Sequence, residues 1–186
     1  MLARLRVAGV LAGAALVTAA CASSPSAGGG QSAGTSTTRV PLPAGRLPSA
    51  VSKMVCSGKT QSELANVLGV SPQQPLVPTW ADHLYTCRLA YTNGTLVLTV
   101  KELSSWGETF SYFRGLGGRL GNVGRLTGLG QGAFTTHNGS VVARKDYKVL
   151  LVDISGLPSS FGVPATSAAD VANTVADVIM GCWAGD

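Results

Sequence analysis

The side chains best suited to chemistry are two histidines and four cysteines, spread thinly along 186 residues. His83 and His137 have no Asp with Ser or Cys at a spacing that indicates a catalytic triad, although such triads assemble in space. A metal site requires clustered Cys and His ligands, and the cysteines show no paired spacing. We therefore expect no catalytic residues, no metal and no cofactor, and we interpret both histidines as surface residues.

The first cysteine follows a segment typical of export. Arg4 and Arg6 precede an apolar run over residues 7–17, which is shorter than the roughly 20 residues that cross a bilayer. A basic start, a short apolar centre and small residues after it predict a secretion signal. The segment ends Leu-Val-Thr-Ala-Ala-Cys at residues 16–21 and resembles a bacterial lipobox, with Thr18 where the motif usually has Leu.

The lipobox resemblance implies that the thiol of Cys21 receives a diacylglycerol. Residues 1–20 are then removed as the signal peptide, and Cys21 becomes the first residue of the mature chain. The alternative is an ordinary secretion signal cut at an Ala-x-Ala pattern, which leaves the Cys21 thiol unmodified. Because two or more acyl chains hold a protein firmly, lipidation predicts a chain anchored on the extracytoplasmic face of the cell membrane.

A tether is expected to separate this cysteine from the folded part. Ser and Gly dominate residues 22–36, a composition typical of a flexible coil, and prolines continue to residue 48. We assign residues 21–50 to the lipidated tether and residues 51–186 to one globular domain. Loss of Arg4 and Arg6 with the signal lowers the formal net charge from +5 to +3, which is too small and too scattered to indicate a nucleic-acid partner.

Three cysteines remain in the domain, Cys56, Cys87 and Cys182. Export places them where disulfides form, and three thiols allow three different pairings with one left over. We favour a disulfide between Cys56 and Cys87, which leaves Cys182 as a buried free thiol. A disulfide between Cys56 and Cys182 is the alternative.

Capping residues followed by apolar residues at helical spacing predict about three helices. The second of them is expected to bury Trp106, Phe110 and Phe113, and the third carries an apolar stripe that ends at Cys182. The expected caps and ends are Thr60 to Gly69, Ser105 to about Arg114, and Ser167 to Cys182.

About five antiparallel strands are predicted, as a hairpin and then a three-stranded meander. Asn93-Gly94 and Asn138-Gly139 are typical of hairpin turns, because both residue types accept positive φ. The last strand is apolar on both faces, which indicates a central strand covered on both sides. The expected strands cover residues 83–91, 95–101, 133–137, 140–144 and 148–154. Helices and an antiparallel sheet together predict an α+β domain.

Residues 115–132 contain eight glycines and are predicted to form a long loop. The segment lacks the phosphate-binding and dinucleotide-binding motifs. Arg114, Arg119 and Arg125 lie in or beside it, with no acidic residue between Glu108 and Asp146. Such a loop could contact anionic lipid head groups or wall polymers; a solvated loop without a ligand is the alternative.

Several motifs together resemble a family of small secreted lipoproteins of actinobacteria whose function is unknown. They are the lipobox, the Ser/Gly tether, Cys-x-Gly-Lys-Thr at residues 56–60, Tyr-Thr-Cys at residues 85–87 and the Gly-rich run of residues 128–134 before the meander. The family lends no catalytic residue. We expect a non-catalytic binding, accessory or sensor module at the cell envelope, contacting an envelope protein, a lipid or a wall polymer. The alternatives are a lipid or small-molecule carrier with an apolar cavity, and a cell-envelope hydrolase.

Overall fold

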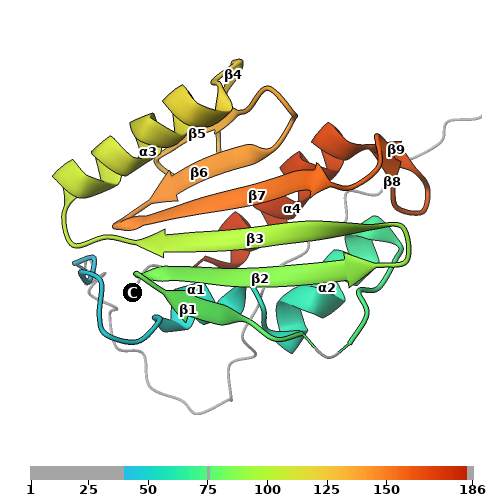
Figure 1. Cartoon of the computed structure of the whole chain (residues 1–186), viewed down its shortest axis with the longest axis horizontal. Helices are drawn as coiled ribbons and strands as arrows, with labels where there is room; N and C mark the ends of the chain where they lie inside the picture. The colour runs from blue at the N-terminus through green and yellow to red at the C-terminus, as the bar shows by residue number, and fades with distance from the viewer. Residues whose placement is uncertain (1–39, 75, 184–186) are drawn as a thin grey trace, which may run out of the picture. The chain divides into compact units, whose positions relative to one another are not determined.

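The computed structural model describes residues 40–74 and 76–183 and shows an α+β domain built on a seven-stranded antiparallel sheet (Figure 1). The predicted signal peptide and the lipidation at Cys21 lie outside the described residues. The predicted α+β class with an antiparallel sheet is confirmed; the main sheet has two strands more than expected, β1 and β4, and α1 is an additional helix. In sheet order the strands are β1 (Thr79–Ala81), β2 (Leu84–Tyr91), β3 (Gly94–Glu102), β7 (Lys148–Gly156), β6 (Val141–Lys145), β5 (Gly132–Thr135) and β4 (Gly124–Leu126).

The sheet joins two units that are distant in the sequence. The β2–β3 hairpin and the β4-to-β7 meander meet where β3 pairs with β7, with Leu98 opposite Val152. Helix α3 (Trp106–Leu120) connects the two units, and a small ribbon of β8 (Ser160–Phe161) and β9 (Thr166–Ser167) precedes the last helix. The pairing of β3 with β7 is a long-range contact that no local pattern specifies.

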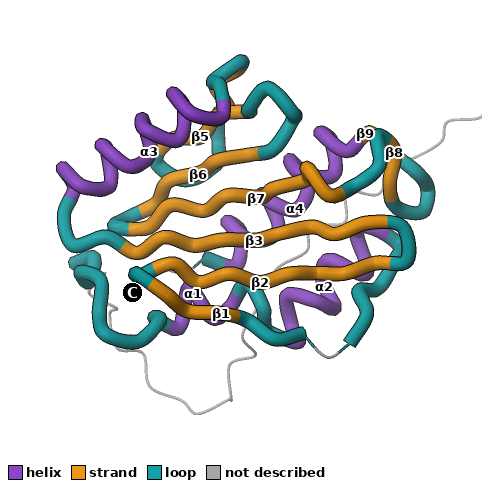
Figure 2. The backbone as a smooth tube through the Cα atoms, in the orientation of Figure 1, coloured by secondary structure: helices purple, strands orange, loops and turns teal. Residues whose placement is uncertain are grey.

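Helices lie on both faces of the sheet. Helices α1 (Ala50–Met54), α2 (Gly58–Leu68) and α4 (Ala168–Cys182) pack on one face, whereas α3 covers β5, β6 and β7 on the other (Figure 2). Within residues 40–183 no helix combines the length and the apolarity needed to cross a bilayer.

The main core fills the layer between the sheet and the α2–α4 pair. Its side chains alternate along each strand, because successive residues of a strand point to opposite faces. The largest fully buried members are Val55, Leu64, Leu89, Leu96, Leu98, Val100, Val141, Leu150, Ile179 and Trp183. A second, smaller core of Leu116, Phe134, Val142 and Val149 lies under α3. Strand β7 therefore contributes to both cores, which confirms its prediction as a central strand.

The predicted helix caps are confirmed for two helices and corrected for one. The hydroxyl oxygen of Ser105 accepts from the Glu108 amide, and that of Ser167 accepts from the Asp170 amide. Helix α2 is capped by Ser57 rather than Thr60, because α2 begins earlier and the Thr60 hydroxyl donates instead to the Met54 carbonyl. Gly69 ends α2 with φ of 65°, as the sequence predicts.

Helix α3 is longer than predicted, and the expected 115–132 loop is therefore wrong over its first part. The helix continues through Gly115, Gly117 and Gly118 to Leu120. Each glycine disfavours the helix by about 1 kcal/mol, but Leu116 lies in the second core and its burial offsets this cost. Residues Gly124–Leu126 of the expected loop form strand β4.

The first hairpin turn is shifted by one residue from the predicted one. Tyr91 pairs directly with Gly94, so the turn residues are Thr92 and Asn93, and Gly94 begins the return strand. A Cβ at Gly94 would lie 2.7 Å from the Gly156 carbonyl oxygen. Gly94 is therefore needed for the close approach of β3 to the end of β7 and not for a positive φ.

Tyr91 has a buried hydroxyl group whose ionisation affects the stability of the fold at high pH. Its ring packs edge-to-face on Phe161 at 4.9 Å, and its hydroxyl has no hydrogen-bond partner among the described residues. Burial raises the pKa of Tyr91 to about 12. The folded protein therefore keeps this proton at a pH where the unfolded chain, with a pKa near 10, has lost it.

The stability that this proton contributes is present below about pH 10 and is lost as the pH rises towards 12. We expect Tyr91→Phe to leave the free energy of unfolding unchanged or up to about 1 kcal/mol higher at pH 7. Between pH 8 and 12 the wild type should lose about 2–3 kcal/mol more than the variant. Urea unfolding across this range measures both effects, and equal alkaline losses in the two proteins would contradict the assignment.

Candidate binding surface

Helix α3 carries two aromatic side chains that the core does not enclose. Trp106 and Phe110 were predicted to be buried, but 40% and 45% of their surfaces are exposed. Thr109 and Leu116 face the sheet. Phe110 directly follows Thr109 and is therefore turned about 100° away from that face, whereas Trp106 is the first residue of the helix and lies at its end. Of the three aromatic residues predicted to be buried here, only Phe113 packs against the second core, with its ring 5.0 Å from that of Phe134.

These rings enclose the side chain of Arg144 on β6. The guanidinium carbon lies 4.5 Å from the centre of the Phe110 ring, 5.6 Å from Trp106 and 5.9 Å from Phe113. Only 7% of the Arg144 surface is exposed. An arginine among aromatic faces is stabilised by the negative charge of the ring faces, so the rings take the place that a carboxylate usually has.

The polar contacts of Arg144 are incomplete. Nη2 donates to the Gln131 carbonyl oxygen at 2.9 Å, and Nη1 donates to Gln131 Oε1 at 3.4 Å. Nε is buried and has no hydrogen-bond partner among the described residues. Burial lowers the pKa of the Arg144 guanidinium from its usual value. The cation is thus held mainly by aromatic faces.

Two further side chains contact the aromatic rings around Arg144. Tyr147, in the β6–β7 turn, packs edge-to-face on Trp106 at 5.2 Å, and the Arg114 guanidinium lies 5.7 Å from the Phe110 ring. We call these five residues, Trp106, Phe110, Arg114, Arg144 and Tyr147, the aromatic–arginine surface. It combines exposed ring faces with one exposed and one enclosed cation.

The three arginines predicted as an anionic-ligand loop do not form one cluster. Arg114 lies on the aromatic–arginine surface, and Arg125 is exposed on β4 opposite Phe134, on the same face of the sheet. Arg119 lies on the other flank of α3, where its charge lowers the pKa of Tyr112 against the raising effect of burial. The sequence found the basic region, but the helical geometry separates Arg119 from the other two.

The chain enters the domain beside the start of α3. The Ala44 amide donates to the Leu103 carbonyl oxygen at 3.0 Å, and Trp80 Nε1 donates to the Arg46 carbonyl oxygen at 3.1 Å. The Ser49 amide donates to Glu102 Oε1 at 2.8 Å. Residues 40–49, which were assigned to the tether, are therefore bonded to the sheet, and we call them the strap.

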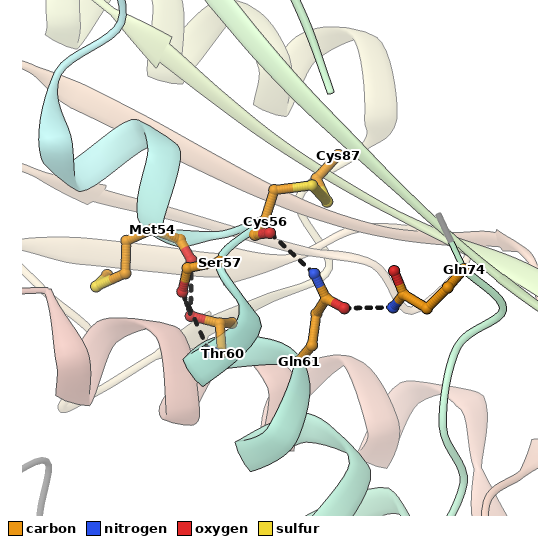
Figure 3. The surroundings of a disulfide bond; sticks show 7 residues. All are labelled: Met54, Cys56, Ser57, Thr60, Gln61, Gln74 and Cys87. Atoms are coloured by element: carbon orange, nitrogen blue, oxygen red, sulfur yellow. Dashed lines mark hydrogen bonds between the residues drawn. A yellow bond between two sulfur atoms is a disulfide. The ribbon is translucent and has the colours of Figure 1, made fainter. Parts of the chain in front are cut away.

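The disulfide between Cys56 and Cys87 is confirmed. It joins the turn before α2 to the centre of β2, across a sequence separation of 31 residues (Figure 3). The Gln61 amide donates to the Cys56 carbonyl oxygen at 2.9 Å and accepts from Gln74. Cys182 is itself disulfide-bonded, so its prediction as a free thiol is wrong.

In the part of the chain that the structure describes, neither histidine side chain forms a hydrogen bond or an ion pair. His83 lies in the β1–β2 turn with φ of 57° and not in a strand, and its ring packs edge-to-face on Trp80 at 5.8 Å. His137 is exposed next to Gly121. Within residues 40–74 and 76–183 no group of three His, Cys, Asp or Glu side chains could hold a metal ion.

Two hollows formed by described residues open to the surface of the domain. One of about 460 Å³ lies between the Gly-rich turn before β5 and the end of α4, with Lys145 and Asp177 in its wall. Another of about 170 Å³ lies beside β7, with Leu120 and Asp153 in its wall. Neither lies in the main core between the sheet and the α2–α4 pair.

The fold and this surface define an α+β domain with an aromatic–arginine patch on one helix. No known family model, curated protein or solved structure matches the chain. The assignment of function therefore depends on the residues and geometry described above.

Two substitutions of Arg144 distinguish the contribution of its packing to stability from the contribution of its charge. We expect Arg144→Met to change the free energy of unfolding by less than about 1 kcal/mol, because an apolar chain of similar length keeps the ring contacts without a buried charge. Arg144→Ala should cost about 2–3 kcal/mol, because it leaves a cavity under Phe110. Urea unfolding of both variants, with exposed Arg88→Met as the control, tests this; a Met variant as unstable as the Ala variant would contradict it.

Proposed function

We propose that this chain is an extracytoplasmic lipoprotein, anchored to the cell membrane through Cys21, whose domain is a non-catalytic binding module of the cell envelope. The aromatic–arginine surface on α3 is the part that contacts the partner. Two further proposals go with this one: the chain is not an enzyme, and it belongs with the small actinobacterial lipoproteins that its motifs resemble.

The observation that carries the binding role is the exposure of Trp106 and Phe110 around an enclosed cation. Aromatic residues and arginine are enriched in binding interfaces because they provide large contact areas with a polar end. Burial of the exposed ring surface by a partner would contribute roughly 25 cal/mol for each Å² of apolar area removed from water. An anion at the same place would meet Arg114 at the rim.

The anchor is supported by the sequence of residues 16–21 and by the disulfide chemistry of the domain. Leu-Val-Thr-Ala-Ala-Cys resembles a lipobox, and a disulfide between Cys56 and Cys87 fits an oxidising compartment outside the cytoplasm. These two features come from separate parts of the chain and favour the same location.

The carrier alternative has less support. A lipid carrier needs an apolar cavity of a few hundred Å³, and the layer between the sheet and α4 is where this fold would provide it. Fully buried side chains occupy that layer, with Leu98, Leu150 and Ile179 at its centre. We therefore assign binding to the surface of α3 and not to the interior.

Site-specific photo-crosslinking in the intact bacterium tests the binding surface. The photoreactive amino acid p-benzoylphenylalanine is placed at Phe110 in one strain and, as a matched control, at Val67 in another. Val67 is similarly exposed, on helix α2 at the other face of the sheet. We expect light-dependent adducts from position 110 in large excess over position 67.

The adducts are then identified by mass as protein, lipid or polymer. Equal adduct yields from the two positions, or none from position 110, would contradict the proposed binding surface. A crosslink from position 67 alone would place the contact on the α2–α4 face.

A further inference from the structure

We infer that the partner of the aromatic–arginine surface is the anionic lipid surface of the membrane that carries the anchor. The domain would then lie on the bilayer through α3 and the strap. This inference depends on the proposed function for the nearness of a membrane, and the test below examines the surface without the anchor.

The first argument is the place where the chain enters the domain. The strap is bonded to Leu103 through Ala44, and Leu103 precedes Trp106 by three residues. The strap therefore lies beside the amino-terminal end of α3 (Figure 1). At this end of the helix the Trp106 ring packs against the Tyr147 ring.

The second argument is the distribution of exposed apolar side chains. Trp106 and Phe110 on α3 are exposed, and the strap adds three more within five residues of Ala44, which are Val40, Leu42 and Leu47. These are half of the ten large apolar side chains that are exposed in the described part of the chain. Two adjoining segments thus present a concentration of apolar surface at the end where the tether arrives.

The third argument is the chemistry of the patch. Tryptophan and tyrosine favour the interface between hydrocarbon and water, because the ring is apolar and the polar atom reaches the head groups. Arginine keeps its charge at the phosphates while its stem lies against apolar groups, and Arg114 already does this over Phe110. The combination fits a phospholipid surface better than a purely polar polymer.

The charges near the patch are compatible with an anionic surface. No acidic residue lies between Glu108 and Asp146 in the sequence. These two carboxylates are engaged locally: Glu108 accepts from the Ser104 amide at 2.9 Å, and Asp146 accepts from Gln131 at 3.3 Å. Arg125, on the same face of the sheet as α3, adds a cation.

The length of chain before the strap permits this contact. Residues 22–39 separate Cys21 from Val40, and fully extended they span at most about 60 Å. The domain therefore stays within this distance of the bilayer surface, where even weak contacts are favoured by the high effective concentration.

The test uses the chain from Cys21 to Asp186 made without the leader, so that no lipid is attached. Its binding to vesicles of 70% phosphatidylcholine and 30% phosphatidylglycerol is measured by sedimentation, with phosphatidylcholine vesicles as the comparison. We expect binding to the anionic vesicles, weakened about tenfold by Phe110→Ser and about fivefold by Arg114→Gln. The matched controls Val67→Ser and Arg88→Gln, both exposed elsewhere, should bind as the wild type does.

A spectroscopic measurement keeps the inference testable if Phe110→Ser is unstable. Of the three tryptophans, Trp106 is exposed, Trp80 is partly buried under the strap and Trp183 is buried. Vesicles with brominated acyl chains should therefore quench the wild type more than Trp106→Phe, and the difference reports on Trp106. Absence of vesicle binding, or equal weakening by the control variants, would overturn the inference.

The same variants distinguish the other outcomes. Binding to purified cell-wall polymer that Phe110→Ser and Arg114→Gln abolish, with vesicle binding unaffected, would overturn the lipid assignment in favour of the polymer. A crosslink from position 110 to a protein, with no vesicle binding, would leave the proposed binding module standing and remove the lipid inference. Vesicle binding by a chain that proves to be unlipidated in the bacterium would support the surface and contradict the anchor.

Discussion

Replacing Cys21 with alanine is expected to abolish lipid attachment and cleavage after Ala20. A lipobox cysteine is modified before the signal is cut, so the variant should incorporate no alkyne-labelled palmitate and keep residues 1–20 or be cut elsewhere. Each methylene of an acyl chain contributes about 0.8 kcal/mol to membrane binding, which makes this the largest effect of any single substitution in the chain. Metabolic labelling and the mass of the chain measure it.

The control for this experiment is Ser23→Ala, two residues further along the same segment. It should incorporate palmitate and fractionate with membranes as the wild type does. If Cys21→Ala is processed normally and still fractionates with membranes as before, the account of the anchor is wrong, whatever the domain binds.

Replacing both Cys56 and Cys87 with alanine is expected to lower the free energy of unfolding by about 3–4 kcal/mol. The disulfide closes a loop of 31 residues, and in the chain-entropy model its loss lets the unfolded chain sample many more conformations. Cys87 is also fully buried in the main core, so the change of side chain adds a small packing cost. Urea unfolding under oxidising conditions measures the difference.

Two comparisons separate the disulfide from the packing. Under reducing conditions the double variant and the wild type should have similar stabilities, because both then lack the Cys56–Cys87 bond and the bond at Cys182. Ser62→Ala, an exposed change on the same helix, should alter stability by less than about 0.5 kcal/mol. A loss below about 1 kcal/mol in the double variant would show that the bond does not constrain the unfolded chain.

The parts of the fold that depend on local chemistry could be predicted from the sequence. Ser105 and Ser167 start their helices as their capping patterns predict, and apolar residues on both faces identify β7 as a central strand. The pairing of β3 with β7 could not be predicted, because it joins segments that are far apart in the sequence. The strap was also missed, since its hydrogen bonds use backbone groups that carry no sequence signal.

Only part of the candidate site could be predicted from the sequence. The cluster of arginines was visible, but the glycines after Arg114 indicated a loop, so the helical separation of Arg119 was missed. Helical spacing predicted that Trp106 and Phe110 would be buried, and the position of α3 at the edge of its layer leaves them half exposed. The enclosure of Arg144 depends on β6 lying under α3, a tertiary contact that residue types do not reveal.

The mass of the amino-terminal peptide, taken without reduction from protein purified out of membranes, tests the central claim most directly. The account predicts a peptide that begins at Cys21 and carries a thioether-linked diacylglycerol. The contradicting result is a peptide in which this sulfur is unmodified, or in which a disulfide joins it to Cys182, because one sulfur cannot hold both bonds.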